Sequence, residues 1–306
     1  MTLLALPIAI IPMILFMFIV RRLDRYDPEP MWLLLLHFFW GAFGAVILSS
    51  IANAKLIALF WGKEIAASGD TPKLAAVLIG PIVEELLKAV VFILTVRLRD
   101  FNNLTDGIVY GASVGFGFAM SENVVYFIRA SGSDNLLQFI LYRTFFSGMM
   151  HAISCATFAA ILGFAQFKYG RVPAKYVLMA FVPSMVLHMS FNFLVSTESV
   201  SILGLVLIAI AFTALTLTFM RSLRFEQKYI REELTKEWQE GLLAKEYIEL
   251  PFKRRQSKRE YQQALICVQI AFERLTARHF TAQNQVKESQ LILQELHKTL
   301  RKLETA

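Results

Sequence analysis

The chain of 306 residues is 56% hydrophobic and 18% charged, with a mean hydropathy of +0.51. This composition is typical of membrane proteins and excludes an ordinary soluble enzyme. Cys155 and Cys267 lie too far apart to predict a disulfide framework or a cysteine metal site. The net charge of +7 gathers at the ends of apolar segments and in the last third of the chain, which predicts contact with the lipid bilayer and no nucleic-acid partner.

The N-terminal two thirds of the chain consist of apolar segments long enough to cross a bilayer as helices. Read in order, these seven predicted spans cover residues 3–20, 31–51, 73–96, 105–129, 136–167, 176–196 and 200–220. Arg21 and Arg22 follow the first segment instead of preceding it, which argues against a cleaved signal peptide. Basic residues are enriched after the first, third and fifth segments and in the C-terminal tail, so we predict an outside N-terminus and a cytoplasmic tail.

The third predicted span carries the most unusual stretch, Gly80-Pro-Ile-Val-Glu-Glu-Leu-Leu-Lys88. One charge at the centre of a bilayer costs about 2.5 to 3.5 kcal/mol, so two adjacent carboxylates indicate function. Glu84 and Lys88 are four residues apart and share a helix face, whereas Glu85 is rotated by about 100°. The two glutamates are therefore predicted to face different neighbours.

The fourth predicted span contains a ridge of small residues and then a polar pair. Gly107, Gly111 and Gly115 recur every four residues, a spacing that allows a second helix to approach closely. Glu122 and Asn123 follow in the later half of the span. Gly41 and Gly44 give the second span a similar small face.

Further polar residues appear in the fifth and sixth predicted spans. His151 lies near the middle of the fifth, which Arg143 enters near its start, and His188 and Asn192 share one face of the sixth at a spacing of four. Intramembrane ionisable residues are functional by default. We therefore expect the polar residues of the four spans to meet at one site inside the bundle.

The composition changes at Arg221, where charged, helix-forming sequence begins. We predict an all-α protein of two parts, a transmembrane bundle over 1–222 and a soluble cytoplasmic tail over 223–306. A charged helix is expected to run to Leu250, before Pro251, and Ser257 with Glu260 forms a capping box. Leucines 293, 296, 300 and 303 then form a heptad-like seam, which predicts a helical hairpin or, alternatively, a surface for self-association.

Several functions remain compatible with these polar residues. Each group could be satisfied separately by a neighbouring helix, or the cluster could serve a non-catalytic binding module. It could also line a transporter or a proton or cation pathway, although no inverted repeat is visible. The remaining alternative is hydrolysis of a peptide bond inside the membrane.

Hydrolysis requires a base, an oxyanion donor and an acid for the leaving amine. Glu84 or Glu85 is a candidate base, and Asn192 is an uncharged candidate donor. Glu122, His151 and His188 provide three ligands suited to Zn²⁺, with a fourth position for water. A metal-free glutamate mechanism uses the same residues, and spacing alone does not separate the two.

At these motifs the sequence resembles the PrsW family of intramembrane proteases, part of a wider group with the CAAX prenyl proteases and bacteriocin-processing relatives. The matching motifs are Glu84-Glu85-Leu-Leu-Lys88, Phe118-Ala-Met-Ser-Glu122, His151 and His188-Met-Ser-Phe-Asn192. The resemblance covers roughly residues 1 to 220 and excludes the tail.

The resemblance implies a protease of the bacterial plasma membrane that makes a first, site-1-type cut in a membrane-anchored protein such as an anti-sigma factor. A catalytically silent relative of such proteases is the alternative. It implies Glu84 and Glu85 as the principal catalytic residues, with Glu122, His151, His188 and Asn192 completing the site. Glu122 stands where the prenyl proteases have a histidine, which argues against prenylated substrates.

Overall fold

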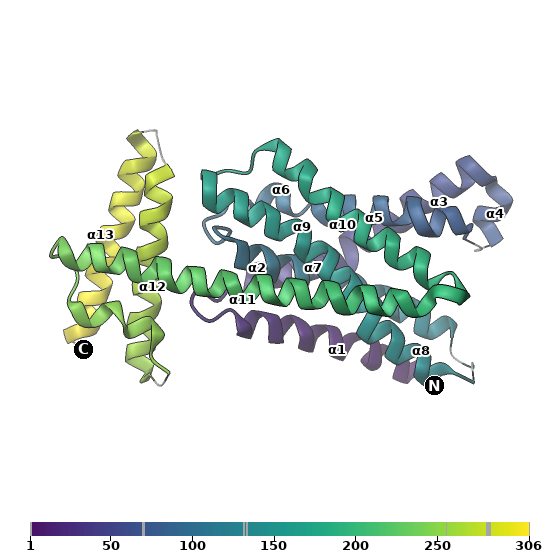
Figure 1. The fold of residues 1–306 in the computed structure, drawn as a ribbon, viewed down its shortest axis with the longest axis horizontal. Coiled ribbons are helices and arrows are strands. Elements are labelled where there is room, and N and C mark those ends of the chain that lie inside the picture. The colour runs from purple at the N-terminus through teal and green to yellow at the C-terminus, as the bar shows by residue number, and fades with distance from the viewer. Residues whose placement is uncertain are drawn as a thin grey trace. The chain divides into compact units, whose positions relative to one another are not determined.

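The computed structural model describes residues 2–68, 71–130, 132, 134–254, 256–279 and 283–305. Within these residues every regular element is helical, which confirms the predicted all-α class (Figure 1). The chain divides into two compact units. We call residues 1–23, 29–167 and 171–218 the transmembrane unit, and residues 24–28, 168–170 and 219–306 the C-terminal unit.

The helices of the transmembrane unit follow the predicted segments closely. They are α1 (Thr2–Leu23), α2 (Met31–Phe39), η1 (Trp40–Ala45), α3 (Val46–Trp61), α4 (Lys63–Ser68), η2 (Ala75–Ile79), α5 (Gly80–Ala89), α6 (Phe92–Thr95), α7 (Leu104–Arg129), α8 (Leu136–Tyr142), η3 (Arg143–Ser147), α9 (Gly148–Tyr169), α10 (Ala174–Val195), η4 (Glu198–Val200) and the first part of α11 (Ser201–Gln239). The segments η1, η2 and η3 are π-helical, and η4 is a 3₁₀ turn.

Five helical stretches within the described residues are long and apolar enough to cross a membrane. They are 6–23, 31–61, 136–169, 174–195 and 201–239. The other two predicted spans are the broken series from η2 to α6 and the glycine-rich α7, and these carry the adjacent glutamates and Glu122. The chain is therefore an integral membrane protein, and the number of seven spans stays a prediction.

The glycine ridge of α7 lies directly against α9. A Cβ added at Gly107 would lie 2.2 Å from the carbonyl oxygen of Ala159, and one at Gly115 would lie 2.3 Å from that of His151. At Gly111 the added atom would lie 2.6 Å from the Cα of Ala156. Only glycine permits main chains to approach so closely, so the predicted ridge is confirmed.

The opposite side of α7 meets the helix formed by α2 and η1. A Cβ at Gly117 would lie 1.9 Å from the carbonyl oxygen of Phe38, and one at Gly41 would lie 2.0 Å from that of Val114. Gly44 instead faces the ring of Trp40 in its own helix. The helix α7 is thus held between two partners, and it is buried continuously from Thr105 to Met120.

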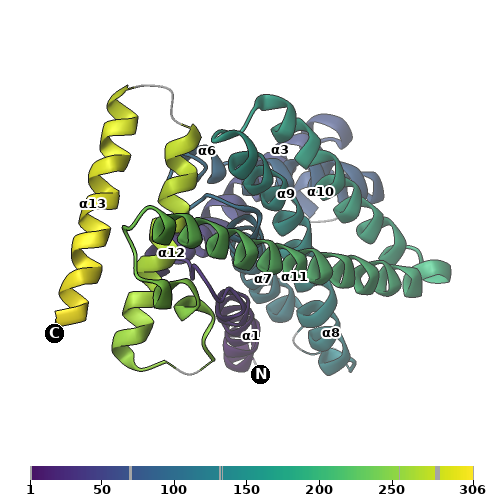
Figure 2. The ribbon, with the colours of Figure 1, turned by 60° about the vertical axis from the view of Figure 1, so that its left-hand side comes forward.

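The C-terminal unit contains the end of α11, the 3₁₀ turns η5 (Lys245–Ile248) and η6 (Leu250–Phe252), and the helices α12 (Lys258–His279) and α13 (Gln283–Thr305). The helix α11 ends at Gln239 and not at Leu250 as predicted, because Gly241 adopts a φ of 74°. The predicted capping box is confirmed, since Glu260 accepts from the Ser257 N–H and the Ser257 hydroxyl accepts from the Glu260 N–H. The helices α12 and α13 lie side by side as a hairpin (Figure 2), while self-association stays a prediction.

Buried charges link the three helices of the C-terminal unit. Glu233 and Glu237 on α11 are each 1% exposed. Arg274 on α12 contacts both glutamates, and His297 Nε2 on α13 lies 2.6 Å from Glu237 Oε2. This hydrogen bond raises the pKa of His297 above its usual 6.5, while burial of the ring and the charge of Arg301 act to lower that pKa.

We predict that Gly111→Ala destabilises the transmembrane unit. The added methyl group would clash with main-chain atoms of α9, and overpacking of this kind costs about 1 to 3 kcal/mol. The measurement is thermal unfolding of the purified protein in detergent. Gly204→Ala is the control, because its nearest neighbour is a side-chain atom, Cγ1 of Val195. Equal unfolding temperatures for both variants would contradict the close main-chain contact.

We predict that His297 stabilises α13 in a pH-dependent manner. Because the folded-state pKa is raised, the contribution is complete below the unfolded pKa and is lost as pH rises through the folded pKa. The measurement is hydrogen–deuterium exchange of α13 in the full chain, compared between wild type and His297→Gln at about pH 5.5 and about pH 8.5. The difference should be large at the lower pH and small at the higher one. Lys298→Gln changes an exposed residue of the same helix and should leave the exchange of α13 the same as in the wild type at both pH values.

Candidate active site

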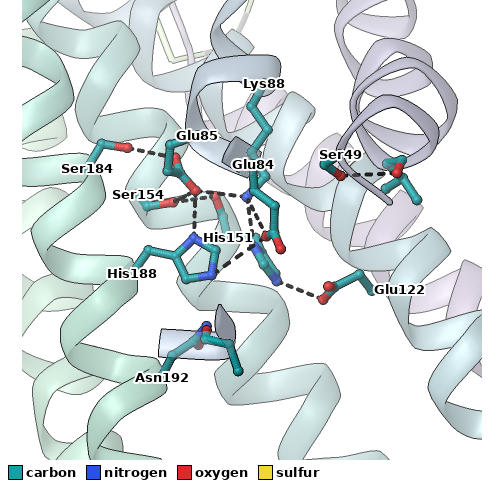
Figure 3. A network of polar contacts seen from close by, with 12 residues as sticks. Ser49, Glu84, Glu85, Lys88, Glu122, His151, Ser154, Ser184, His188 and Asn192 are labelled. Carbon is teal, nitrogen blue, oxygen red and sulfur yellow. Dashed lines mark hydrogen bonds and ion pairs between the residues drawn. The ribbon is translucent and has the colours of Figure 1, made fainter. Parts of the chain in front are cut away.

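The polar residues of the transmembrane unit meet between α5, α7, α9 and α10 (Figure 3). Glu85 is at the centre of this cluster and is 2% exposed. Its Oε1 lies 2.8 Å from both Lys88 Nζ and His188 Nδ1 and accepts from the Ser154 hydroxyl at 3.1 Å. Its Oε2 accepts from the Ser184 hydroxyl at 2.7 Å. Both oxygens of this carboxylate are therefore engaged by partners on three helices.

Lys88 is fully buried and connects the glutamates to a histidine. Its Nζ lies 2.8 Å from Glu85 Oε1 and 2.9 Å from Nδ1 of His151. It also lies 4.0 Å from the centroid of the Phe118 ring, a cation–π distance. Glu84, the partner suggested by the spacing of four, is further away at 3.9 Å. Glu85 is thus the main counter-charge of the ammonium group.

Glu84 differs from Glu85 in its surroundings. Its Oε2 is buried and lies 3.8 Å from His188 Nε2 and 3.9 Å from Lys88 Nζ. Within the described part of the chain this oxygen has no hydrogen-bond partner. One glutamate is therefore saturated with donors, and the other has an oxygen with acceptor capacity left.

Glu122 and His151 form the second half of the cluster. Glu122 Oε2 lies 2.9 Å from His151 Nε2 and accepts from Nη2 of Arg143 at 2.9 Å. Glu122 projects from the late part of α7, and His151 projects from the first turn of α9. The glycine contact between these two helices therefore brings the pair together.

The hydrogen-bond partners assign the tautomers of both histidines. An ionised carboxylate only accepts, so His188 carries its proton on Nδ1 and His151 carries its proton on Nε2. The lone pair of His188 is then on Nε2, the nitrogen nearest Glu84. That of His151 is on Nδ1, beside Lys88. The two rings meet edge to face with centroids 4.9 Å apart.

Asn192 lies one helical turn beyond His188 and outside this network (Figure 3). Its Nδ2 donates to the carbonyl oxygen of Ala76 at 3.0 Å. Ala76 belongs to η2, the π-helical segment just before the glutamate motif. An amide carries two N–H groups, so a second donor remains after this contact.

Three side chains of the cluster have the donor types of a catalytic zinc site, which commonly combines histidines with a carboxylate. One ligand atom each from Glu84, His151 and His188 lies within 4.8 Å of the others. The set expected from the sequence had Glu122 in place of Glu84, but the Oε2 of Glu122 is engaged by His151 and Arg143. The unbonded oxygen of Glu84 suits a cation. The Lys88 ammonium group lies 3.9 Å from that oxygen and 2.9 Å from Nδ1 of His151, so it occupies part of the space between these ligand atoms.

Sequence reasoning did not assign site contacts to Ser154, Ser184 or Arg143. Serines are frequent in membrane helices and give no spacing signal. The arginine did give a signal, since a charge within an apolar segment is costly.

Comparisons with known proteins agree with the motifs. The family model described as "PrsW family intramembrane metalloprotease" matches residues 29–218. Protease PrsW of Clostridioides difficile (strain 630) is 30% identical over 195 residues, covering 62% of this chain and 79% of that relative. Protease PrsW of Bacillus subtilis (strain 168) is 29% identical over 177 residues, covering 58% of this chain and 75% of that relative. No solved structure matches the chain.

We predict that Ser184→Ala destabilises the transmembrane unit by about 1.5 to 3 kcal/mol, the usual loss for a hydrogen bond to a charged group. The change would leave Oε2 of buried Glu85 without its donor. The measurement is thermal unfolding in detergent. Ser196→Ala is the matched control, because Ser196 is exposed and its hydroxyl donates to the nearby main-chain carbonyl of Phe193. An unchanged unfolding temperature for Ser184→Ala would show that Glu85 does not depend on this donor.

Proposed function

The chain belongs to the PrsW family of intramembrane metalloproteases, and from this premise we propose that Glu84 activates the water that cleaves a membrane-anchored protein. The observation that carries the proposal is the buried Oε2 of Glu84, which lacks a hydrogen bond and lies beside the lone-pair nitrogen of His188. A general base needs such a free lone pair within reach of its water.

Glu84 and Glu85 have different roles in this proposal. Glu84 takes a proton from water as the water oxygen bonds to the scissile carbonyl carbon. The resulting carboxylic acid then returns the proton to the leaving nitrogen as the C–N bond breaks. Glu85 does not exchange protons, because its donors hold both oxygens. It orients His188 and compensates Lys88.

The carbonyl oxygen of the substrate gains negative charge during the attack and needs a donor. We assign this role to Asn192, through the N–H that remains beyond the bond to Ala76. Lys88 adds a positive charge beside the proposed base, 3.9 Å from Glu84 Oε2.

The ion suited to these donors is Zn²⁺, and Glu84, His151 and His188 would hold it. A bound zinc ion supplies a Lewis acid and lowers the pKa of bound water. In the metal-free version Glu84 is the base that takes the proton of the water, whereas with an ion bound it would be a ligand of that ion.

The site is displaced toward one end of the transmembrane unit. Glu122 and His188 lie in the last third of α7 and α10, near the end of the unit where α11 begins. With the predicted outside N-terminus, this end faces the outside of the bacterial plasma membrane. We therefore propose a first cut in the outer half of a single-span substrate, with an anti-sigma factor as the candidate class.

The test is cleavage of a single-span anti-sigma factor tagged at both ends, in cells that carry wild type, Glu84→Gln or Glu85→Gln. Loss of a general base costs about 100-fold or more, so Glu84→Gln should abolish cleavage while the protein still accumulates. The sizes of the tagged fragments should place the cut in the outer half of the span.

Glu64→Gln, an exposed change in α4, is the matched control and should cleave like wild type. Zinc is measured in the purified wild type and in His188→Gln, and zinc present only in the wild type would support the metal version. Normal cleavage by Glu84→Gln would refute its role as base. If no variant alters cleavage, ion flux through the same proteins tests the transport alternative.

A further inference from the structure

Arg143 is a buried cation that the proposed chemistry does not use. It begins η3 and is 8% exposed. Its Nη2 donates to Glu122 Oε2 at 2.9 Å, and its Nε donates to Asn123 Oδ1 at 3.0 Å. Its Cζ lies 3.7 Å from the centroid of the Tyr126 ring. Two N–H donors and one face of the guanidinium group are thus held by the last turns of α7.

The π-helical segment explains how Arg143 and His151 reach the same carboxylate. In a regular α-helix, residues eight positions apart differ by about 80° in direction. In η3 the Gly148 N–H donates to the Arg143 carbonyl, five residues back, and this wider turn reduces the rotation. Both side chains consequently lie 2.9 Å from Glu122 Oε2.

We propose that Arg143 is a positioning residue, which holds the Glu122 carboxylate where it accepts the Nε2–H of His151. That hydrogen bond fixes the His151 ring and directs the Nδ1 lone pair toward Lys88. The polar contacts that define this role are those of Arg143 with Glu122 and Asn123. The inference rests on the proposed function, because the reaction that benefits is the one assigned above.

An arginine that only compensates charge would behave differently from a positioning residue. Removing a purely structural arginine should lower activity in proportion to folded protein, whether or not Glu122 is present. A positioning residue should lose its effect when Glu122 is replaced, because the two act as one unit. A double-mutant cycle separates these cases.

The cycle compares cleavage by full-length protein reconstituted in vesicles, normalised to folded protein. The variants are Arg143→Met, Glu122→Gln and their combination. Arg143→Met should lower the cleavage rate about 100-fold, the scale of loss for a misplaced site group. In the Glu122→Gln background, Arg143→Met should lower the cleavage rate by a further factor of less than about three. Arg129→Met, which removes an exposed arginine from the end of α7, should cleave like wild type.

A second readout needs no cleavage. ¹⁵N NMR of labelled histidine rings distinguishes the two tautomers. The signal of His151 is identified as the one that is missing from the His151→Gln variant. His151 should be protonated on Nε2 in wild type and in Glu84→Gln, and should become a tautomer mixture in Arg143→Met. If Arg143→Met does not accumulate, the same cycle uses Arg143→Lys, which keeps the charge but lacks the planar fork.

Additive losses in the cycle, or an unchanged His151 tautomer in the arginine variant, would overturn the positioning role. Normal cleavage by Glu84→Gln would instead overturn the proposed function. The two failures are therefore distinguishable in one set of proteins.

Discussion

Charge compensation in a medium of low dielectric constant is the constraint on which the site depends. An isolated charge in the bilayer is costly, so each charge here has a neighbour of opposite sign or a polar group. Glu85, Lys88, His151, Glu122 and Arg143 form an unbroken hydrogen-bonded series, in which an ammonium group and an imidazole lie between the two carboxylates and a guanidinium group ends the series. Removal of any one member leaves a neighbour buried without its partner, so the series acts as a unit. Glu84 is beside this series and is less completely bonded, which is why it is the member assigned to chemistry.

Main-chain contact between α7 and α9 supplies the geometry that this series requires. Gly115 of α7 lies against the carbonyl of His151, the same residue whose ring meets Glu122. A side chain at position 115 would separate the helices and with them the imidazole and the carboxylate. Packing and chemistry therefore depend on the same few residues.

Much of this arrangement was predictable from the sequence, and the rest depends on rotations that spacing does not encode. The glycine ridge, the Ser257 cap and the polar motifs each have a local signal, because period and residue type determine them. The presence of Glu84 in the potential ligand set, in place of Glu122, depends on how α5 and α7 are turned about their axes. The π-helical segments change those rotations by one residue and have no sequence signature. The early end of α11 depends on the left-handed conformation of Gly241, which competes with favourable helix formers around it.

The contact between Asn192 and η2 has a consequence for how selection acts on this region. Its acceptor is the main-chain carbonyl of Ala76, which every amino acid provides. Substitution at residue 76 would therefore preserve this hydrogen bond as long as the new side chain packs, whereas substitution of Asn192 would remove the donor. Covariation between homologous sequences would therefore leave this contact undetected, although it joins α10 to the segment that presents the glutamates.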